Sequence, residues 1–166
     1  MRVLWSPLHG LSATAMRTLV TFLATGAYLG YVPLIPGTAG SVLGLILGKL
    51  LAPLWVHSPA AFLMLFGVLF AGACLVAGAA EKLYGEHDAS TIVIDEVFGM
   101  VAAMCFNPTG WVALLTAFAL FRFFDIVKPW PASYFDRMNG GAGVMLDDLA
   151  AGIYANLVLQ IVRRLI

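Results

Sequence analysis

Charged residues are few in this chain. Nine Lys or Arg and nine Asp or Glu occur among 166 residues, and the formal net charge is zero. This balance does not provide the basic surface that nucleic-acid binding or the steering of polyanions requires. Cysteine is also rare, and Cys74 and Cys105 are far from the CxxC spacing of a metal motif. We therefore expect no nucleic-acid partner, no disulfide framework and no cysteine-bound metal.

Apolar residues dominate instead. They make up 61% of the chain, and the mean hydropathy is +0.94. The ranges 18–48, 60–80 and 97–121 contain no charged residue, and a bilayer core requires about 20 apolar residues per helix. These runs predict an all-α fold, a polytopic helical membrane bundle of about five to six helices, some of them short. At this length we expect a single domain over residues 1–166.

Proline, glycine and the apolar runs predict where the helices begin and end. We expect helices at 18–32, 41–51, 60–80, 92–106, 111–127 and 145–164, with a loop at 132–143. Pro33 and Pro36 would end the first helix, and Ser41 would cap the second. Pro53 would end or kink that second helix near Trp55. Residues 1–16 are expected to form a retained interfacial segment, not a cleaved signal peptide.

The polar residues concentrate in four clusters between the apolar runs. The clusters lie at 36–41, at 87–96, at 122–137 and at 147–148. Two predicted helices separate the first cluster from the second, and two more separate the second from the third. Because a pair of antiparallel spans returns the chain to the face that it left, all four clusters are expected at one membrane face. The order of helices thus supports a single shared site.

Two acidic pairs, Asp95-Glu96 and Asp147-Asp148, stand near predicted helix starts. Carboxylates beside a membrane-length apolar run are unfavourable unless they are compensated. One interpretation is that each pair complements the dipole of its helix. The other is a Mg²⁺ site, because a bound cation relieves the repulsion between carboxylates and Mg²⁺ prefers oxygen ligands. We favour the metal site.

Basic and hydroxyl residues near these pairs point to a bound phosphate. Arg122 and Lys128 are natural phosphate donors. Arg122 also lies three residues before Asp125, so an ion pair within one helix is the alternative. The segment 36–41 (PGTAGS) resembles an anion nest ahead of a helix N-terminus, without the lysine of a P-loop.

A histidine next to an aspartate offers a route for a proton. His87 could protonate a leaving oxygen, with the Asp88 carboxylate orienting the ring. A lone histidine in a loop is more often merely solvated, so both interpretations stay open. The pair Asp136-Arg137 favours a structural contact within a loop.

Four segments resemble the phosphatidylglycerophosphatase A family. They are PGTAGS at 36–41, HDASTIVIDEVFGM at 87–100, FRFFDIVKPWPASYFDR from 121, and GGAGVMLDDLAAG up to 152. The resemblance extends over about residues 20–160, with order and spacing preserved. The matching polar positions are Thr38, Ser41, His87, Asp88, Asp95, Glu96, Arg122, Asp125, Lys128, Asp136, Arg137, Asp147 and Asp148. The chain departs from the pattern at Met138-Asn139, where some members have a histidine.

The resemblance implies a Mg²⁺-dependent phosphatase of the bacterial inner membrane. It would remove the terminal phosphate of phosphatidylglycerophosphate to give phosphatidylglycerol, so its partners would be the membrane and a phospholipid substrate. The family's pathway implies a site at the cytoplasmic face, whereas the distribution of Lys and Arg gives no clear orientation. We prefer attack by water to a phospho-aspartate intermediate, because no DxD motif occurs and Mg²⁺ would occupy the best carboxylates.

Together with the resemblance, the residue types assign three roles. The catalytic candidates are Asp95, His87, Asp88 and Asp148. The substrate-binding candidates are Thr38, Ser41, Arg122, Lys128 and Arg137. The candidate ligands of Mg²⁺ are Asp95, Glu96, Asp125, Asp147 and Asp148.

Other functions compete with this interpretation. A CDP-alcohol phosphotransferase requires a DGxxAR element, and a lipid phosphatase with a histidine nucleophile requires a PSGH motif; the sequence has neither. A small transporter of an ion or metal could use intramembrane carboxylates equally well, but it would not need Arg122 and Lys128 beside an anion nest. A non-catalytic assembly subunit predicts that Asp95 and Asp148 can be replaced without loss of function.

Overall fold

Helices make up all the regular structure in residues 13–165, the part of the chain that the structure, a computed structural model, describes. Within that range no strand occurs. The elements are α1 (Ala13–Ala24), the 3-10 helix η1 (Leu29–Tyr31), α2 (Pro36–His57), α3 (Pro59–Tyr84), α4 (Ile94–Met104), α5 (Trp111–Val127), α6 (Ala132–Phe135) and α7 (Gly141–Leu165). The predicted N-terminal segment lies mostly outside the described residues.

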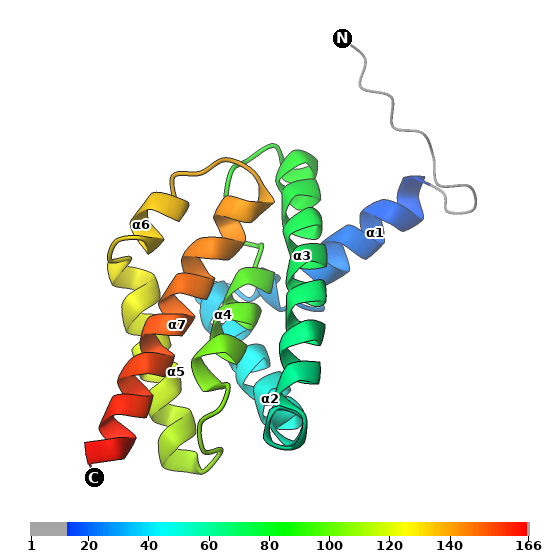
Figure 1. Ribbon diagram of the computed structural model, residues 1–166. Coiled ribbons are helices and arrows are strands. Elements are labelled where there is room, and N and C mark those ends of the chain that lie inside the picture. Colours follow the sequence, from blue (N-terminus) through cyan, green and yellow to red (C-terminus); the bar gives the residue numbers. More distant parts are fainter. Residues whose placement is uncertain (1–12, 166) are drawn as a thin grey trace.

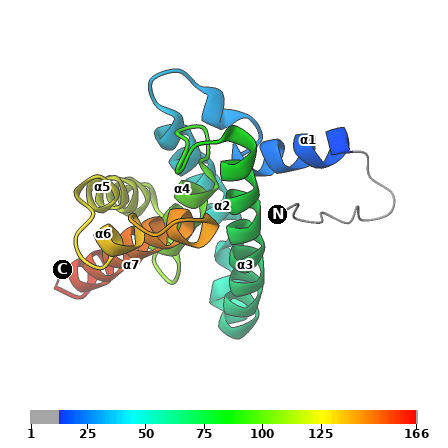
Figure 2. The same cartoon turned by 90° about the horizontal axis from the view of Figure 1, so that it is seen from above.

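The short helix α4 occupies the middle of the bundle. It packs against α2 on one side and α7 on the other, while α5 and α3 also pack against α7 (Figure 1). Helix α1 contacts α3 and projects away from the other helices, as the view from above also shows (Figure 2). Three helices are long and apolar enough to cross a membrane: Pro36–His57, Pro59–Tyr84 and Gly141–Arg164. The predicted all-α membrane bundle is confirmed, with the four-residue α6 added inside the loop expected at 132–143.

The boundary between the first two helices differs from the prediction. Helix α1 ends at Ala24, and Gly26, Ala27 and Tyr28 follow with positive φ. Helix α2 then begins at Pro36, so Ser41 lies inside it and does not cap it. Proline is favoured in the first turn, where a backbone N–H has no partner within the helix anyway. The Ser41 hydroxyl donates a hydrogen bond of 2.8 Å to the Gly37 carbonyl, one turn back.

Helix α2 also continues through Pro53, which we expected to end or kink it. It reaches His57 because tertiary packing holds its last turn. Trp55 is only 2% exposed, and its ring meets that of Phe62 edge-on with centroids 5.2 Å apart. Helix α3 follows directly and ends at Tyr84; the next residue, Gly85, has a φ of 71°, a conformation that glycine adopts readily. Helix α3 thus extends four residues beyond the predicted end at 80, and α7 begins at Gly141, four residues before its predicted start at 145.

Glycines allow α4 to approach its two neighbours closely. A Cβ on Gly152 of α7 would collide with the carbonyl of Gly99 in α4. A Cβ on Gly44 of α2 would lie 2.7 Å from the carbonyl oxygen of Val97 in α4. Small residues at such positions let membrane helices pack backbone to backbone. This packing sets the first turn of α4 directly between α2 and α7.

Candidate functional site

A polar cavity of about 350 Å³ lies at the end of the bundle where the four polar clusters meet. The helix ends bring the clusters there: the start of α2, the loop after α3, the start of α4, the end of α5 and the first turns of α7. The charged residues that line the cavity are Asp88, Asp95, Glu96, Arg122, Asp125, Lys128, Asp147 and Asp148. The cavity thus draws charged residues from segments that are up to 60 residues apart along the chain (148 − 88).

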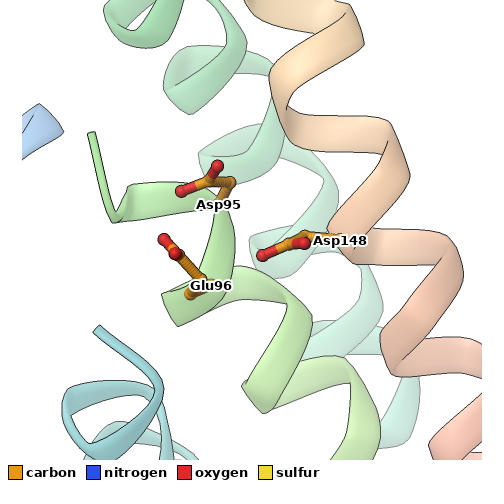
Figure 3. Close-up of side chains that lie close together, drawn as sticks. All are labelled: Asp95, Glu96 and Asp148. Atoms are coloured by element: carbon orange, nitrogen blue, oxygen red, sulfur yellow. The ribbon is translucent and has the colours of Figure 1, made fainter. Parts of the chain in front are cut away.

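Three carboxylates that line this cavity lie close together. Asp95 and Glu96 come from the first turn of α4, and Asp148 faces them from α7 (Figure 3). One oxygen of each lies within 4.8 Å of the others. Asp95 is 6% exposed and Asp148 is 3% exposed. Among residues 13–165, this is the group of carboxylates whose spacing suits a single cation.

Several carboxylate oxygens at the cavity have no hydrogen-bond partner. Among the buried atoms of residues 13–165, Asp95 Oδ1, Glu96 Oε2, Asp147 Oδ1 and Asp148 Oδ2 all lack one. A buried polar atom without a partner costs about 1–3 kcal/mol, and more when it is charged. A hard cation would satisfy these oxygens, because Mg²⁺ binds carboxylate oxygen. The donor set therefore fits a magnesium ion.

Arg122 is held from two sides at the wall of the cavity. Its Nη1 lies 2.9 Å from Asp125 Oδ2, three residues along α5, and donates to Ser41 Oγ at 3.4 Å. A Cβ on Gly37 would lie 3.1 Å from the same nitrogen and would collide with Glu96 Oε1. The ion pair within the helix is therefore present, and the guanidinium still lines the cavity. Gly37 leaves the space in which Arg122 and Glu96 lie.

Lys128 connects two elements beside the cavity. It ends α5 in a left-handed conformation with φ of 44°. Its Nζ donates to Asp147 Oδ2 at 2.7 Å and to Asp136. Burial lowers the pKa of Lys128, but the hydrogen bonds to Asp136 and Asp147 outweigh it and raise that pKa above its ordinary value. Lys128 is thus a fixed positive charge between the loop after α6 and α7.

His87 lies beside Glu81, a residue that the sequence analysis did not single out. Its Nδ1 donates to Glu81 Oε1, so Glu81 and not Asp88 orients the ring, which corrects our prediction. Glu81 also accepts the backbone N–H of Asp88 at 3.2 Å. Asp88 lines the cavity, whereas His87 and the exposed Arg137 are not among the described lining residues. The signal in the sequence was Glu81 itself, an acidic residue near the end of an apolar run and six residues before His87.

The contact between His87 and Glu81 predicts a dependence of stability on pH. The hydrogen bond to Glu81 raises the pKa of His87, although burial lowers it. Because the folded chain binds this proton more tightly than the unfolded chain, the pair stabilises the fold fully below about pH 6.5. That contribution is lost as the pH rises through the raised pKa. We expect His87→Asn to lower the unfolding temperature in detergent at pH 5.5 and to have no effect at pH 9.

The matched control for this measurement is Glu86→Gln in the same loop, since Glu86 is exposed. Its effect on the unfolding temperature should be small and the same at both pH values. A loss in His87→Asn that does not change with pH would contradict the proposed protonated pair.

The two predicted hydroxyl residues lie at or behind the wall of the cavity. Thr38 lines the cavity from the first turn of α2, and Ser41 is buried behind Arg122. The mouth includes Leu34 and Ile35, two apolar residues that our sequence analysis passed over. Charge and motif patterns could not identify them, because nothing in the sequence separates them from lipid-facing residues.

The chain is similar to proteins whose family is known. The family model described as Phosphatidylglycerophosphatase A matches residues 22–163. A Haemophilus influenzae protein named phosphatidylglycerophosphatase A is 39% identical over 142 residues, which cover 84% of this chain and 86% of that protein. An Escherichia coli protein of the same name is 34% identical over 146 residues, covering 84% of this chain and 81% of that protein.

A third relative has a different name. A Bacteroides thetaiotaomicron protein, provisionally named phosphatidylinositol-3-phosphatase, is 37% identical over 155 residues, which cover 87% of this chain and 94% of that protein. No solved structure matches the chain.

Proposed function

The chain belongs to the phosphatidylglycerophosphatase A family, and we propose from this that it hydrolyses the terminal phosphate of phosphatidylglycerophosphate. The products are phosphatidylglycerol and inorganic phosphate. Because the chain belongs to a phosphatase family, we no longer favour the alternative function of an ion transporter. The three apolar helices keep the enzyme in the membrane, where a diacyl lipid substrate also lies.

One observation carries this proposal. Four carboxylates with buried, unpartnered oxygens lie in the same cavity as the side chains of Arg122 and Lys128. Acidic groups alone suit a cation, and basic groups alone suit an anion. Their combination suits a phosphate ester bound together with a divalent metal ion.

Magnesium is the proposed cofactor, with Asp95, Glu96 and Asp148 as its ligands. When bound, Mg²⁺ supplies charge neutralisation of the phosphate and lowers the pKa of a bound water. Asp125 and Asp147, which the sequence analysis also assigned to the metal, are engaged with Arg122 and Lys128. In this proposal those two carboxylates hold the basic side chains in place.

The basic side chains bind the phosphate. Arg122 directs its guanidinium donors at the non-bridging oxygens, because Asp125 and Ser41 restrict its rotamer. A fixed donor of this kind stabilises the charge that develops on those oxygens without reorganisation during the reaction. Lys128 adds a second positive charge that does not titrate in the physiological range. These contacts would give the site affinity for a phosphate monoester.

The reaction itself is the displacement of an alcohol by water. The water oxygen attacks phosphorus, the bond between phosphorus and the glycerol oxygen breaks, and an acid donates a proton to that oxygen; of the two water protons, one stays on the released phosphate and the other replaces the proton that the acid donated. Asp88 lines the cavity and is placed better than His87 to donate this proton. The Glu81 carboxylate accepts the backbone N–H of Asp88 and also accepts from the ring of His87, the residue before it. These two contacts hold Asp88 in position. We place the site at the cytoplasmic face of the bacterial inner membrane, as the family's pathway implies.

Removal of the metal tests the cofactor directly. With purified protein in detergent micelles, we expect phosphate release from phosphatidylglycerophosphate to fall at least about a hundredfold in excess EDTA and to return with Mg²⁺. The unfolding temperature should rise with Mg²⁺, because the ion binds the folded chain. Release that continues in EDTA would contradict the metal, and no release under either condition would contradict the activity. Faster release from phosphatidylinositol 3-phosphate would reassign the substrate.

A further inference from the structure

Two exposed apolar side chains stand at the mouth of the polar cavity. Leu34 is 99% exposed and Ile35 is 53% exposed. Both line the cavity that holds the carboxylates and Arg122. Apolar residues at the opening of a charged site cannot contribute to binding the phosphate. They can contact only the part of a ligand that lies outside the charged region.

The backbone holds these two residues in place. Leu34 has a φ of 71°, which is uncommon for a residue with a side chain. Pro33 and Pro36 flank the pair, and each proline fixes its own φ and restricts the residue before it. The segment between α1 and α2 projects beyond the helices in the view from above (Figure 2). The mouth is therefore a stiff apolar edge, not a loose loop.

We propose that Leu34 and Ile35 contact the first methylenes of the acyl chains of the lipid substrate, and so favour a diacyl lipid over water-soluble phosphate esters. This inference rests on the proposed phosphatase function. With the phosphate at Arg122, the rest of the lipid must leave the cavity through its mouth. The apolar edge then contacts the segment where the headgroup meets the chains.

Exposure alone does not carry this inference, since many apolar residues of the bundle face lipid. Leu75 on α3 is 78% exposed and is not among the described residues that line the cavity. Leu34 and Ile35 differ from it because they border the charged site. Leu75 therefore provides a matched control with the same side chain and similar exposure.

The test is surface-dilution kinetics in mixed micelles, with the mole fraction of long-chain phosphatidylglycerophosphate varied. The variant is Leu34→Asn with Ile35→Thr, because asparagine tolerates positive φ and threonine keeps the branched Cβ. We expect its interfacial KM to rise about tenfold, as the loss of apolar contact predicts, with kcat within twofold of wild type. A conservative double variant, Leu34→Met with Ile35→Val, keeps apolar side chains at both positions and should have the wild-type KM. The control variant Leu75→Asn should also have the wild-type KM.

A second substrate separates the possible outcomes. The deacylated headgroup, glycerophosphoglycerophosphate, should be hydrolysed equally by wild type and by the double variant. An unchanged KM for the lipid, or an equal loss on both substrates, would overturn the inference while leaving the phosphatase function intact. A wild type that releases phosphate from neither substrate would overturn the proposed function, and the inference with it.

Discussion

Asp95→Asn is expected to lower kcat for phosphate release by about a thousandfold, which corresponds to about 4 kcal/mol of transition-state stabilisation. Asp95 is buried in the first turn of α4, with one oxygen near the oxygens of Glu96 and Asp148. The amide keeps the shape of the side chain but removes the charge that a divalent cation requires. The measurement is single-turnover phosphate release in micelles at saturating Mg²⁺.

The fold of this variant should survive, which separates a functional role from a structural one. Because Asp95 Oδ1 is buried without a hydrogen-bond partner, neutralising the group removes an unfavourable buried charge. We expect an unfolding temperature in EDTA equal to or above that of wild type, and no rise on addition of Mg²⁺. Glu86→Gln, at an exposed loop position, should keep both the activity and the response to Mg²⁺. An active Asp95→Asn would exclude this cluster as the metal site.

Gly152→Ala is expected to lower the free energy of unfolding by about 3 kcal/mol, although alanine favours helices over glycine. The new Cβ would collide with the carbonyl of Gly99, a backbone atom that cannot rotate away. Helices α4 and α7 would have to separate, which would move Asp148 away from Asp95 and Glu96. The measurement is the unfolding temperature in detergent, together with phosphate release.

Gly72→Ala in α3 provides the control, because a Cβ there has no described atom within 4 Å. Its stability should be unchanged or slightly higher, as the helix propensity of alanine predicts. Equal effects of the two substitutions would show that the contact between Gly152 and Gly99 does not limit the packing of α4 on α7.

The pattern of apolar runs was sufficient to predict where the polar clusters would meet. Helix pairs return the chain to its starting face, so the even number of helices between clusters brought residues 36–41, 87–96 and 122–128 to one cavity. The prediction did not depend on helix boundaries. Those were less accurate, because Pro36 begins α2 and packing of Trp55 carries α2 past Pro53.

Individual contacts within the site were not predictable in the same way. Lys128 reaches both Asp136 and Asp147 because it ends α5 in a left-handed conformation. His87 pairs with Glu81 because the chain turns at Gly85, whose φ is positive. A change of φ at one residue redirects all that follows, and the sequence does not specify which carboxylate a side chain will then meet.

The sequence by itself determined the membrane-embedded helical class and the family, and it singled out each charged residue that lines the cavity, although it also included His87 and Arg137, which do not. It could do so because hydrophobic runs and motif spacing are properties of the chain in one dimension. Only the tertiary structure decided which carboxylates cluster without partners, that Gly152 and Gly99 bring α4 against α7, and that Leu34 borders the cavity. The physical reason is that burial, close packing and the absence of a hydrogen-bond partner depend on neighbours from distant segments, which only the folded bundle brings together.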